Sequence, residues 1–191
     1  MPETLKSHIS KFIEISEEEF AAISGFFQII NPHKKETLLM AGEVCRFNYF
    51  VVSGCLRLFF IDNKGTEKTV QFAIENWWLA DYFSFQARKS AEFGIQAVEK
   101  SQVLAIDYFA QEKMLAQFPK MERYFRLVHQ RAHAASQLRT KYFYDFSRED
   151  LYHHFSNSFP EFIQRIPQYL LASYLDITPE YLSELRAKNI S

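Results

Sequence analysis

The histidines come nearest to a metal or catalytic pattern. His129 and His133 lie four residues apart in a stretch with helical periodicity, a spacing that suits a metal pair on one face of a helix. No Glu lies between them, as it does in zinc proteases, and neither His153 nor His154 is an obvious third ligand. We therefore expect ordinary surface histidines and no metal site.

No other pattern in the chain points to catalysis or a cofactor. There is no phosphate-binding loop, nucleophile elbow or paired-cysteine motif. Cys45 and Cys55, the only two cysteines, lie in apolar, strand-like runs, so we expect buried free thiols. We therefore expect a protein that is not an enzyme. The sequence also lacks a basic-then-apolar leader and any apolar run of about 20 residues, so we expect a cytoplasmic protein.

Residues 167–188 have the pattern of two short helices joined by a tight turn, a helix-turn-helix. Ala172 supplies the small residue needed where two helices cross closely, and Asp176 falls in the turn. Thr178 suits an N-cap and Pro179 the first helical position. The residues expected to face DNA are Thr178, Glu180, Tyr181, Ser183, Glu184, Arg186 and Lys188. Any helical hairpin gives a similar pattern.

A long helix is expected before this segment, because residues 120–143 contain neither Gly nor Pro. Residues 119–143 hold six basic residues and one acidic residue, Glu122, so the helix is strongly basic. Its 4-3 spacing of mostly apolar residues predicts a dimerisation seam, although packing within the chain gives nearly the same spacing. The seam consists of Met121, Phe125, Val128, Ala132, Ala135 and Tyr142, with Arg139 as its polar member.

Short strands are expected between the two ends of the chain. The first 30 residues look helical, and Ser16 followed by three glutamates suits a helix N-cap. Between residues 34 and 106, four of the five glycines separate runs rich in Val, Phe, Tyr and Thr. The clearest hairpin has a turn at residues 62–65 and a returning strand at 69–72.

The expected fold class is therefore α+β. A double-stranded β-helix (jelly roll) would occupy residues 1–118 and a dimerisation helix residues 119–145. A helix-turn-helix would occupy residues 146–191, truncated before any β-wing.

In this order of elements the chain resembles the Crp/Fnr transcription regulators, in particular the Bacteroidetes type. The stretches that carry the resemblance are Val51–Arg57, Glu75–Trp78, Ile95–Glu99 and Leu171–Thr178. The resemblance implies a cyclic-nucleotide-binding-like domain and a homodimer on two-fold-symmetric double-stranded DNA. It also implies RNA polymerase and a small-molecule effector as further partners, and no membrane.

The positions that hold cyclic AMP in this family differ here. Where such members carry Gly-Glu and then Arg-Ser, this chain has Ala80-Asp81 and Ala91-Glu92, so a phosphate would meet a carboxylate instead of a guanidinium. The sequence therefore predicts an effector other than cyclic AMP. The residues that the resemblance assigns to the effector pocket are Asp81, Tyr82, Phe83, Ser84, Ala91 and Glu92.

The reading helix also departs from the family pattern. Pro179 and Glu184 stand where the family often places arginines, and Glu180 could accept a hydrogen bond from cytosine. The alternative function is therefore a sensor or protein-interaction module with a weak or vestigial DNA-binding segment.

Overall fold

The computed structural model describes residues 3–188, which form two compact units. The first unit holds the described residues up to Phe60 together with Gln71–Gln130. The second holds Ile61–Val70 and the described residues from Arg131 onward.

Two short helices open the chain, α1 (Glu3–Ile9) and α2 (Glu17–Ser24). Ser16 and Glu19 form the predicted capping box at the start of α2, since each side chain bonds the other residue's backbone amide. The chain becomes extended sooner than expected, because β1 (Gln28–Ile30) already pairs with residues 103–105.

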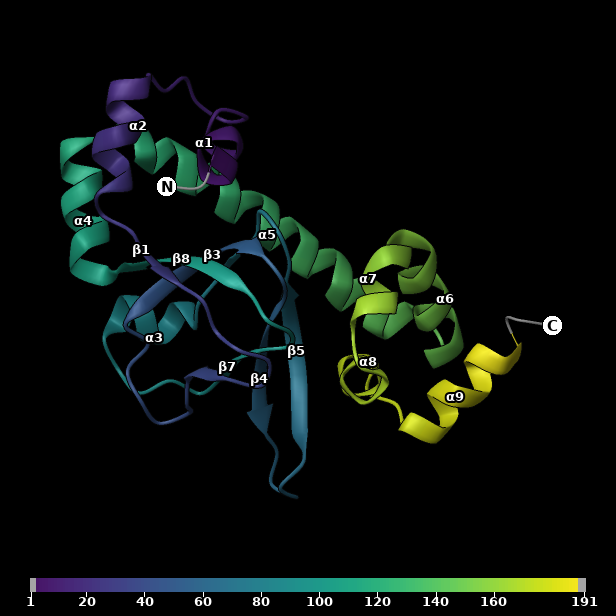
Figure 1. Cartoon of the computed structure of the whole chain (residues 1–191). Coiled ribbons are helices and arrows are strands. Elements are labelled where there is room, and N and C mark those ends of the chain that lie inside the picture. Colours follow the sequence, from purple (N-terminus) through teal and green to yellow (C-terminus); the bar gives the residue numbers. More distant parts are fainter. Residues whose placement is uncertain (1–2, 189–191) are drawn as a thin grey trace. The chain divides into compact units, whose positions relative to one another are not determined.

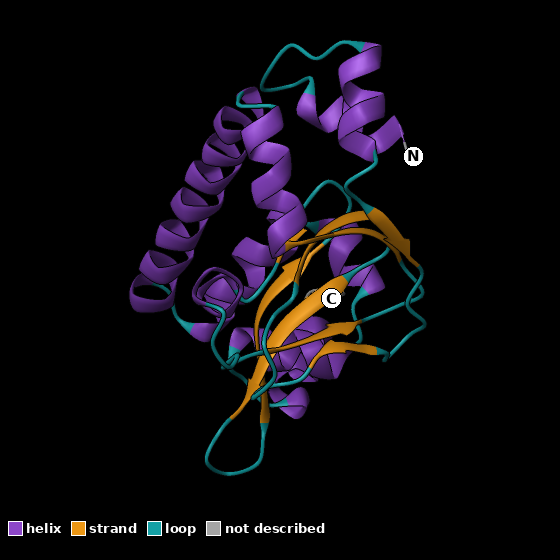
Figure 2. Cartoon of the chain, turned by 90° about the vertical axis from the view of Figure 1, so that its left-hand side faces the viewer, coloured by secondary structure: helices purple, strands orange, loops and turns teal. Residues whose placement is uncertain are grey.

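Among the described residues, eight strands form two four-stranded sheets (Figures 1 and 2). One sheet has the order β1-β8-β3-β6, with β3 (Phe47–Ser53), β6 (Trp78–Leu79) and β8 (Gln102–Asp107). The other has the order β2-β7-β4-β5, with β2 (Thr37–Leu39), β7 (Gly94–Ala97), β4 (Leu56–Ile61) and β5 (Glu67–Ala73). This β-sandwich agrees with the expected mixture of strands and helices.

One core of the first unit lies where helices meet the sheet that contains β3 and β8. Its fully buried side chains include Phe50 on β3 and Leu104 on β8. They pack with side chains from α1, α2, α4 (Tyr108–Gln117) and the first turns of α5, the helices that Figure 1 shows gathered beside these strands. Tyr124 of α5 lies at the centre of this core.

The β4–β5 turn has the predicted chemistry. The Asp62 carboxylate accepts the backbone amides of Lys64 and Thr66, and Gly65 has φ 77°, a conformation that glycine adopts at low cost. Both strands continue through the boundary between the units, since β4 ends at Ile61 and β5 begins at Glu67.

Helices make up the rest of the second unit. The expected long helix is α5 (Lys120–Asp145), whose C-terminal part belongs here, and α6 (Arg148–Ser158) begins after Ser147, whose hydroxyl accepts the Asp150 amide. Then come α7 (Pro160–Arg165), α8 (Gln168–Leu175) and α9 (Pro179–Lys188). No helix in the described range is long and apolar enough to cross a membrane.

Candidate functional site

The residues predicted to read DNA lie on α9 and at the turn before it. Asp176 ends α8 in the left-handed conformation, with φ 55°, as the turn requires. The Thr178 hydroxyl accepts the Tyr181 amide at 3.2 Å and so caps α9, whose first residue is Pro179. The predicted cap and turn are therefore both present.

Packing between α8 and α9 determines which side of α9 faces outward. Ala172 and Leu175 of α8 are buried, as are Leu182 and Leu185 of α9. Thr178, Glu180, Ser183, Glu184 and Lys188 are exposed, whereas Tyr181 and Arg186 are half-buried. The predicted set thus lies mainly on one accessible face.

The charge on this face is balanced. Glu180 and Glu184 oppose Arg186 and Lys188, and the Lys188 ammonium lies 4.0 Å from the Glu149 carboxylate. Phosphate contacts normally require a surplus of cations. The outward face of α9 by itself supplies no such surplus of positive charge.

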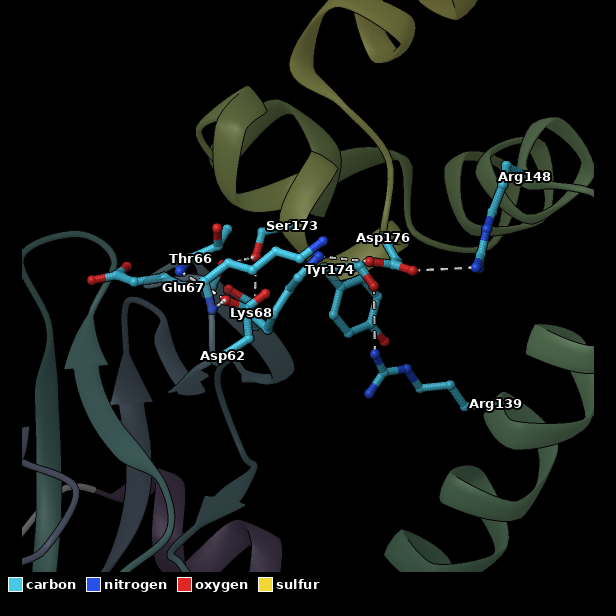
Figure 3. A network of polar contacts seen from close by, with 11 residues as sticks. Asp62, Thr66, Glu67, Lys68, Arg139, Arg148, Ser173, Tyr174 and Asp176 are labelled. Carbon is cyan, nitrogen blue, oxygen red and sulfur yellow. Dashed lines mark hydrogen bonds and ion pairs between the residues drawn. The ribbon is translucent and has the colours of Figure 1, made fainter.

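Asp176 also takes part in a polar network within the second unit (Figure 3). Its carboxylate pairs with Lys68 at 2.8 Å and with Arg148 at 3.3 Å. The Lys68 hydrogen bond is the main reason that the pKa of Asp176 lies below its ordinary value, and the charges of Lys68 and Arg148 add to the shift. The sequence did not indicate this network, because Lys68 and Asp176 are far apart along the chain.

The predicted effector pocket is built around Asp81, which is almost fully buried. One carboxylate oxygen accepts the Ser84 amide at 3.0 Å and caps α3 (Tyr82–Ala87). The other accepts the amides of Glu92 at 3.1 Å and Phe93 at 3.4 Å. Asp81 therefore ties the start of α3 to the loop that leads into β7, and both of its oxygens are occupied.

Ser84 and Ala91 add further hydrogen bonds around α3 and the loop that leads into β7. The Ser84 hydroxyl accepts the Cys45 amide at 2.8 Å and donates to the Lys89 carbonyl. Ala91 is buried, and its backbone N–H and C=O bond Glu43 and Gly42. The structure thus brings Asp81, Ser84 and Glu92 together through bonds among themselves, and it ties Ser84 and Ala91 to residues outside the predicted set.

Tyr82, Phe83 and Glu92 point to different surroundings. The Tyr82 ring meets the His129 ring edge-on at 4.9 Å, and burial raises the pKa of Tyr82 and lowers that of His129. Phe83 is 66% exposed, and the Glu92 side chain is exposed as well. His129 is therefore a ring-packing residue of this region, which its sequence spacing did not indicate.

A cleft of about 630 Å³ lies elsewhere in the first unit. Its lining includes the guanidinium-bearing residues Arg46 and Arg88, the acid Asp107 and the rings of Tyr108 and Phe109. It includes none of the six residues predicted for the effector pocket.

The predicted seam of α5 divides into three parts. Met121 and Phe125 are buried in the first unit's core, and Val128 packs against that core. At the other end Tyr142 stacks on Phe146, with ring centroids 5.0 Å apart. Only the middle of the seam, Ala132 and Ala135, is exposed, and packing within the chain accounts for its two ends.

The histidines form no metal site within the described residues. No group of three or more His, Cys, Asp or Glu side chains among the described residues is arranged to hold a metal ion. His153 lies 3.8 Å from the Glu149 carboxylate, and His154 packs against the ring of Tyr142. Cys45 and Cys55 are buried and form no disulfide among the described residues, and burial raises the pKa of the Cys45 thiol to about 11.

Comparisons with known proteins agree with this architecture. Residues 30–118 match the family described as Cyclic nucleotide-binding domain. No curated protein sequence matches the chain.

Solved structures of Crp/Fnr-type regulators share the fold over most of the chain. The c-di-GMP responsive global regulator CLP of Xanthomonas campestris aligns with a TM-score of 0.72 at 12% identity, covering 91% of each chain. FixK2 of Bradyrhizobium japonicum aligns with a TM-score of 0.70 at 13% identity, covering 85% of this chain and 83% of its own. The Thermus thermophilus catabolite activator protein aligns with a TM-score of 0.56 at 18% identity, covering 93% of this chain and 84% of its own. At these identities the likeness is one of fold.

Proposed function

We propose that the chain is a DNA-binding transcription regulator of the Crp/Fnr type, in which α8 and α9 form a helix-turn-helix. The observation that carries this proposal is the α8–α9 junction. Asp176 makes the turn, Thr178 caps α9, and buried Leu182 and Leu185 leave the opposite face of α9 free. This is the arrangement in which a second helix enters the major groove.

The likeness to whole regulators supports the proposal. CLP and FixK2 each align with at least 85% of this chain; CLP is a global regulator and the Thermus protein a catabolite activator. By analogy with these proteins, we propose that the chain acts without catalysis, through contacts with DNA.

We further propose that the chain binds DNA as a homodimer through the exposed middle of α5. Ala132 and Ala135 permit close helix approach, and Leu138 beside them is 53% exposed. Two reading helices would then meet a two-fold-symmetric site. Any contact with RNA polymerase would follow from binding at a promoter.

The effector in this proposal is not cyclic AMP. Asp81 already holds three backbone amides, so a ribose hydroxyl would have to displace them, and Ala91 offers no cation to a phosphate.

Selection from random duplex DNA tests the main proposal. Purified protein should enrich one sequence with two-fold symmetry and half-sites about one helical turn apart. A pool that stays random after repeated rounds would contradict sequence-specific binding.

A second candidate is a sensor or protein-interaction module whose DNA-binding segment is vestigial. The balanced charge of α9, with Glu184 at its exposed face, favours this alternative. The variant Glu184→Arg separates the two candidates. If it gains DNA affinity without any sequence preference, the segment is vestigial; if it loses the preference that the wild type shows, Glu184 reads DNA.

A further inference from the structure

Strand β5 lies at the end of its sheet, so one of its sides has no neighbouring strand in the order β2-β7-β4-β5. Such an edge leaves backbone N–H and C=O groups without partners. In β5 a side chain of α8 acts as the partner of two of these backbone groups. The Ser173 hydroxyl accepts the Thr69 amide at 2.9 Å and donates to the Glu67 carbonyl at 2.8 Å.

This pair of bonds follows the geometry of a β-sheet. In a parallel ladder one residue bonds the N–H of one neighbour and the C=O of the residue two positions before it. Thr69 and Glu67 have this relation, so the Ser173 hydroxyl takes the place of a parallel strand. Thr69 is only 3% exposed, so its amide depends on this partner.

Arg139 of α5 joins the same two elements. Its guanidinium donates to the Val70 carbonyl and, at 3.5 Å, to the Tyr174 carbonyl. It also lies 4.1 Å from the centre of the Tyr174 ring. Arg139, predicted as the polar member of a dimer seam, is thus engaged within its own chain.

An ion-pair layer lies outside these hydrogen bonds (Figure 3). Asp176 pairs with Lys68 from the hairpin and with Arg148 from α6, and all three side chains are between 33% and 48% exposed. Exposed ion pairs of this kind are screened by salt, whereas the hydrogen bonds of Ser173 join uncharged groups.

We propose that Glu67–Val70, Arg139, Ser173 and Asp176 form a clasp through which the β4–β5 hairpin positions the helix-turn-helix. The proposal deepens the regulator function above and rests on it. The clasp engages α8 and the turn, and none of its contacts involves the outward residues Glu180, Ser183 or Glu184 of α9. It therefore positions the reading helix and leaves its DNA face open.

The β4–β5 hairpin also connects the first unit covalently to the clasp. Leu58 on β4 and Phe72 on β5 are buried side chains of the first unit, and the same two strands lead to residues 61–70. A ligand that changes the twist or register of these strands would shift Glu67–Val70 and so loosen or tighten the clasp.

Hydrogen exchange tests the clasp without DNA. In Ser173→Ala, exchange of the Thr69 amide should rise about tenfold or more, since its acceptor is gone. The Thr66 amide, bonded to Asp62 at 2.9 Å within the turn, is the internal control and should keep its rate. Alanine favours the helix, so the variant should fold. An unchanged Thr69 rate would overturn the clasp.

The positioning role of the clasp is tested by measuring the affinity for the duplex that the wild-type protein selects. Lys68→Ala should weaken binding roughly five- to tenfold, in the range of typical coupling between sites. The matched control is Lys64→Ala, which removes the same charge from the turn of the same hairpin and should change affinity less than about twofold. Equal losses in the two variants would show that Lys68 acts by charge alone and would overturn the positioning role.

The two experiments separate failure of the clasp from failure of the regulator function. If the wild type selects no duplex, the regulator function fails, and with it the positioning role of the clasp. The Thr69 exchange rate still decides in that case whether the clasp itself exists.

Discussion

Asp81, which the resemblance assigns to an effector pocket, holds backbone amides of its own chain. Its carboxylate accepts the amides of Ser84, Glu92 and Phe93, so the chain itself occupies the acceptor that a ribose hydroxyl would need. Replacing charge-assisted hydrogen bonds of this kind costs about 1.5–3 kcal/mol each.

We therefore expect no binding of cyclic AMP at cellular concentrations. Calorimetric titration of the purified protein should show no saturable heat up to about millimolar ligand, the range in which a binding free energy is only about 4 kcal/mol. Micromolar or tighter binding would contradict this prediction.

His129 makes the stability of the first unit depend on pH. Burial against Tyr82 and Phe125 lowers the pKa of His129 in the folded chain, so the unfolded chain binds this proton more readily. The contribution of neutral His129 is present above the ordinary histidine pKa of about 6.5 and is lost as the pH falls through the lower folded value.

The variant His129→Phe should therefore lose less stability than the wild type between about pH 7 and pH 5. Urea unfolding at several pH values measures the difference, with His33→Asn, which removes an exposed histidine, as the control. Parallel pH profiles for wild type and His129→Phe would rule out this role.

At the scale of elements, Tyr124 links α1, β6 and α5. Its hydroxyl accepts the Trp78 indole N–H at 2.8 Å and lies 2.8 Å from His8 Nδ1, to which it donates when that nitrogen carries no proton. Both Tyr124 and Trp78 are buried.

Tyr124→Phe should lower the free energy of unfolding by about 1–3 kcal/mol, because it leaves the buried Trp78 N–H without an acceptor. Chemical denaturation followed by tryptophan fluorescence measures this loss. Tyr144→Phe, at a side chain that is 87% exposed, should change little. Equal stability of all three proteins would show that the Tyr124 hydroxyl is energetically neutral.

Local signals were sufficient to predict several of these elements. Ser16 caps a helix, Asp62–Gly65 makes a turn and Asp176 lies in the turn between two helices, as their neighbours in sequence indicated. In each case the deciding hydrogen bond spans only a few residues.

Tertiary partners could not be predicted in the same way. Ser173 bonds residues more than 100 positions away, and no periodicity records that meeting. The helical spacing that placed Met121 and Phe125 on a dimer seam is the same spacing that buries them in the core. Asp81 did carry a local signal, since an Asp directly before a helix is a common N-cap.

At the scale of the whole molecule, the proposed dimer depends on the exposed stretch of α5. Ala135→Glu would place a carboxylate where two helices approach closely, and burying an unpaired charge costs several kcal/mol. Helix formation itself should persist, because Glu is a good helix former.

Light scattering after size exclusion should show a dimer for the wild type and a monomer for Ala135→Glu. Ser136→Glu adds the same charge one residue away, off the predicted seam, and should remain dimeric. If both variants behave alike, the seam does not form the interface.

The proposed regulator function depends most directly on specific DNA binding. Protein should be titrated into the duplex that it selects and into a scrambled duplex, at several salt concentrations. We predict that the selected duplex binds at least about a thousand-fold more tightly and that affinity falls steeply with salt as phosphate contacts are lost. Equal, weak binding of both duplexes would contradict the proposed function.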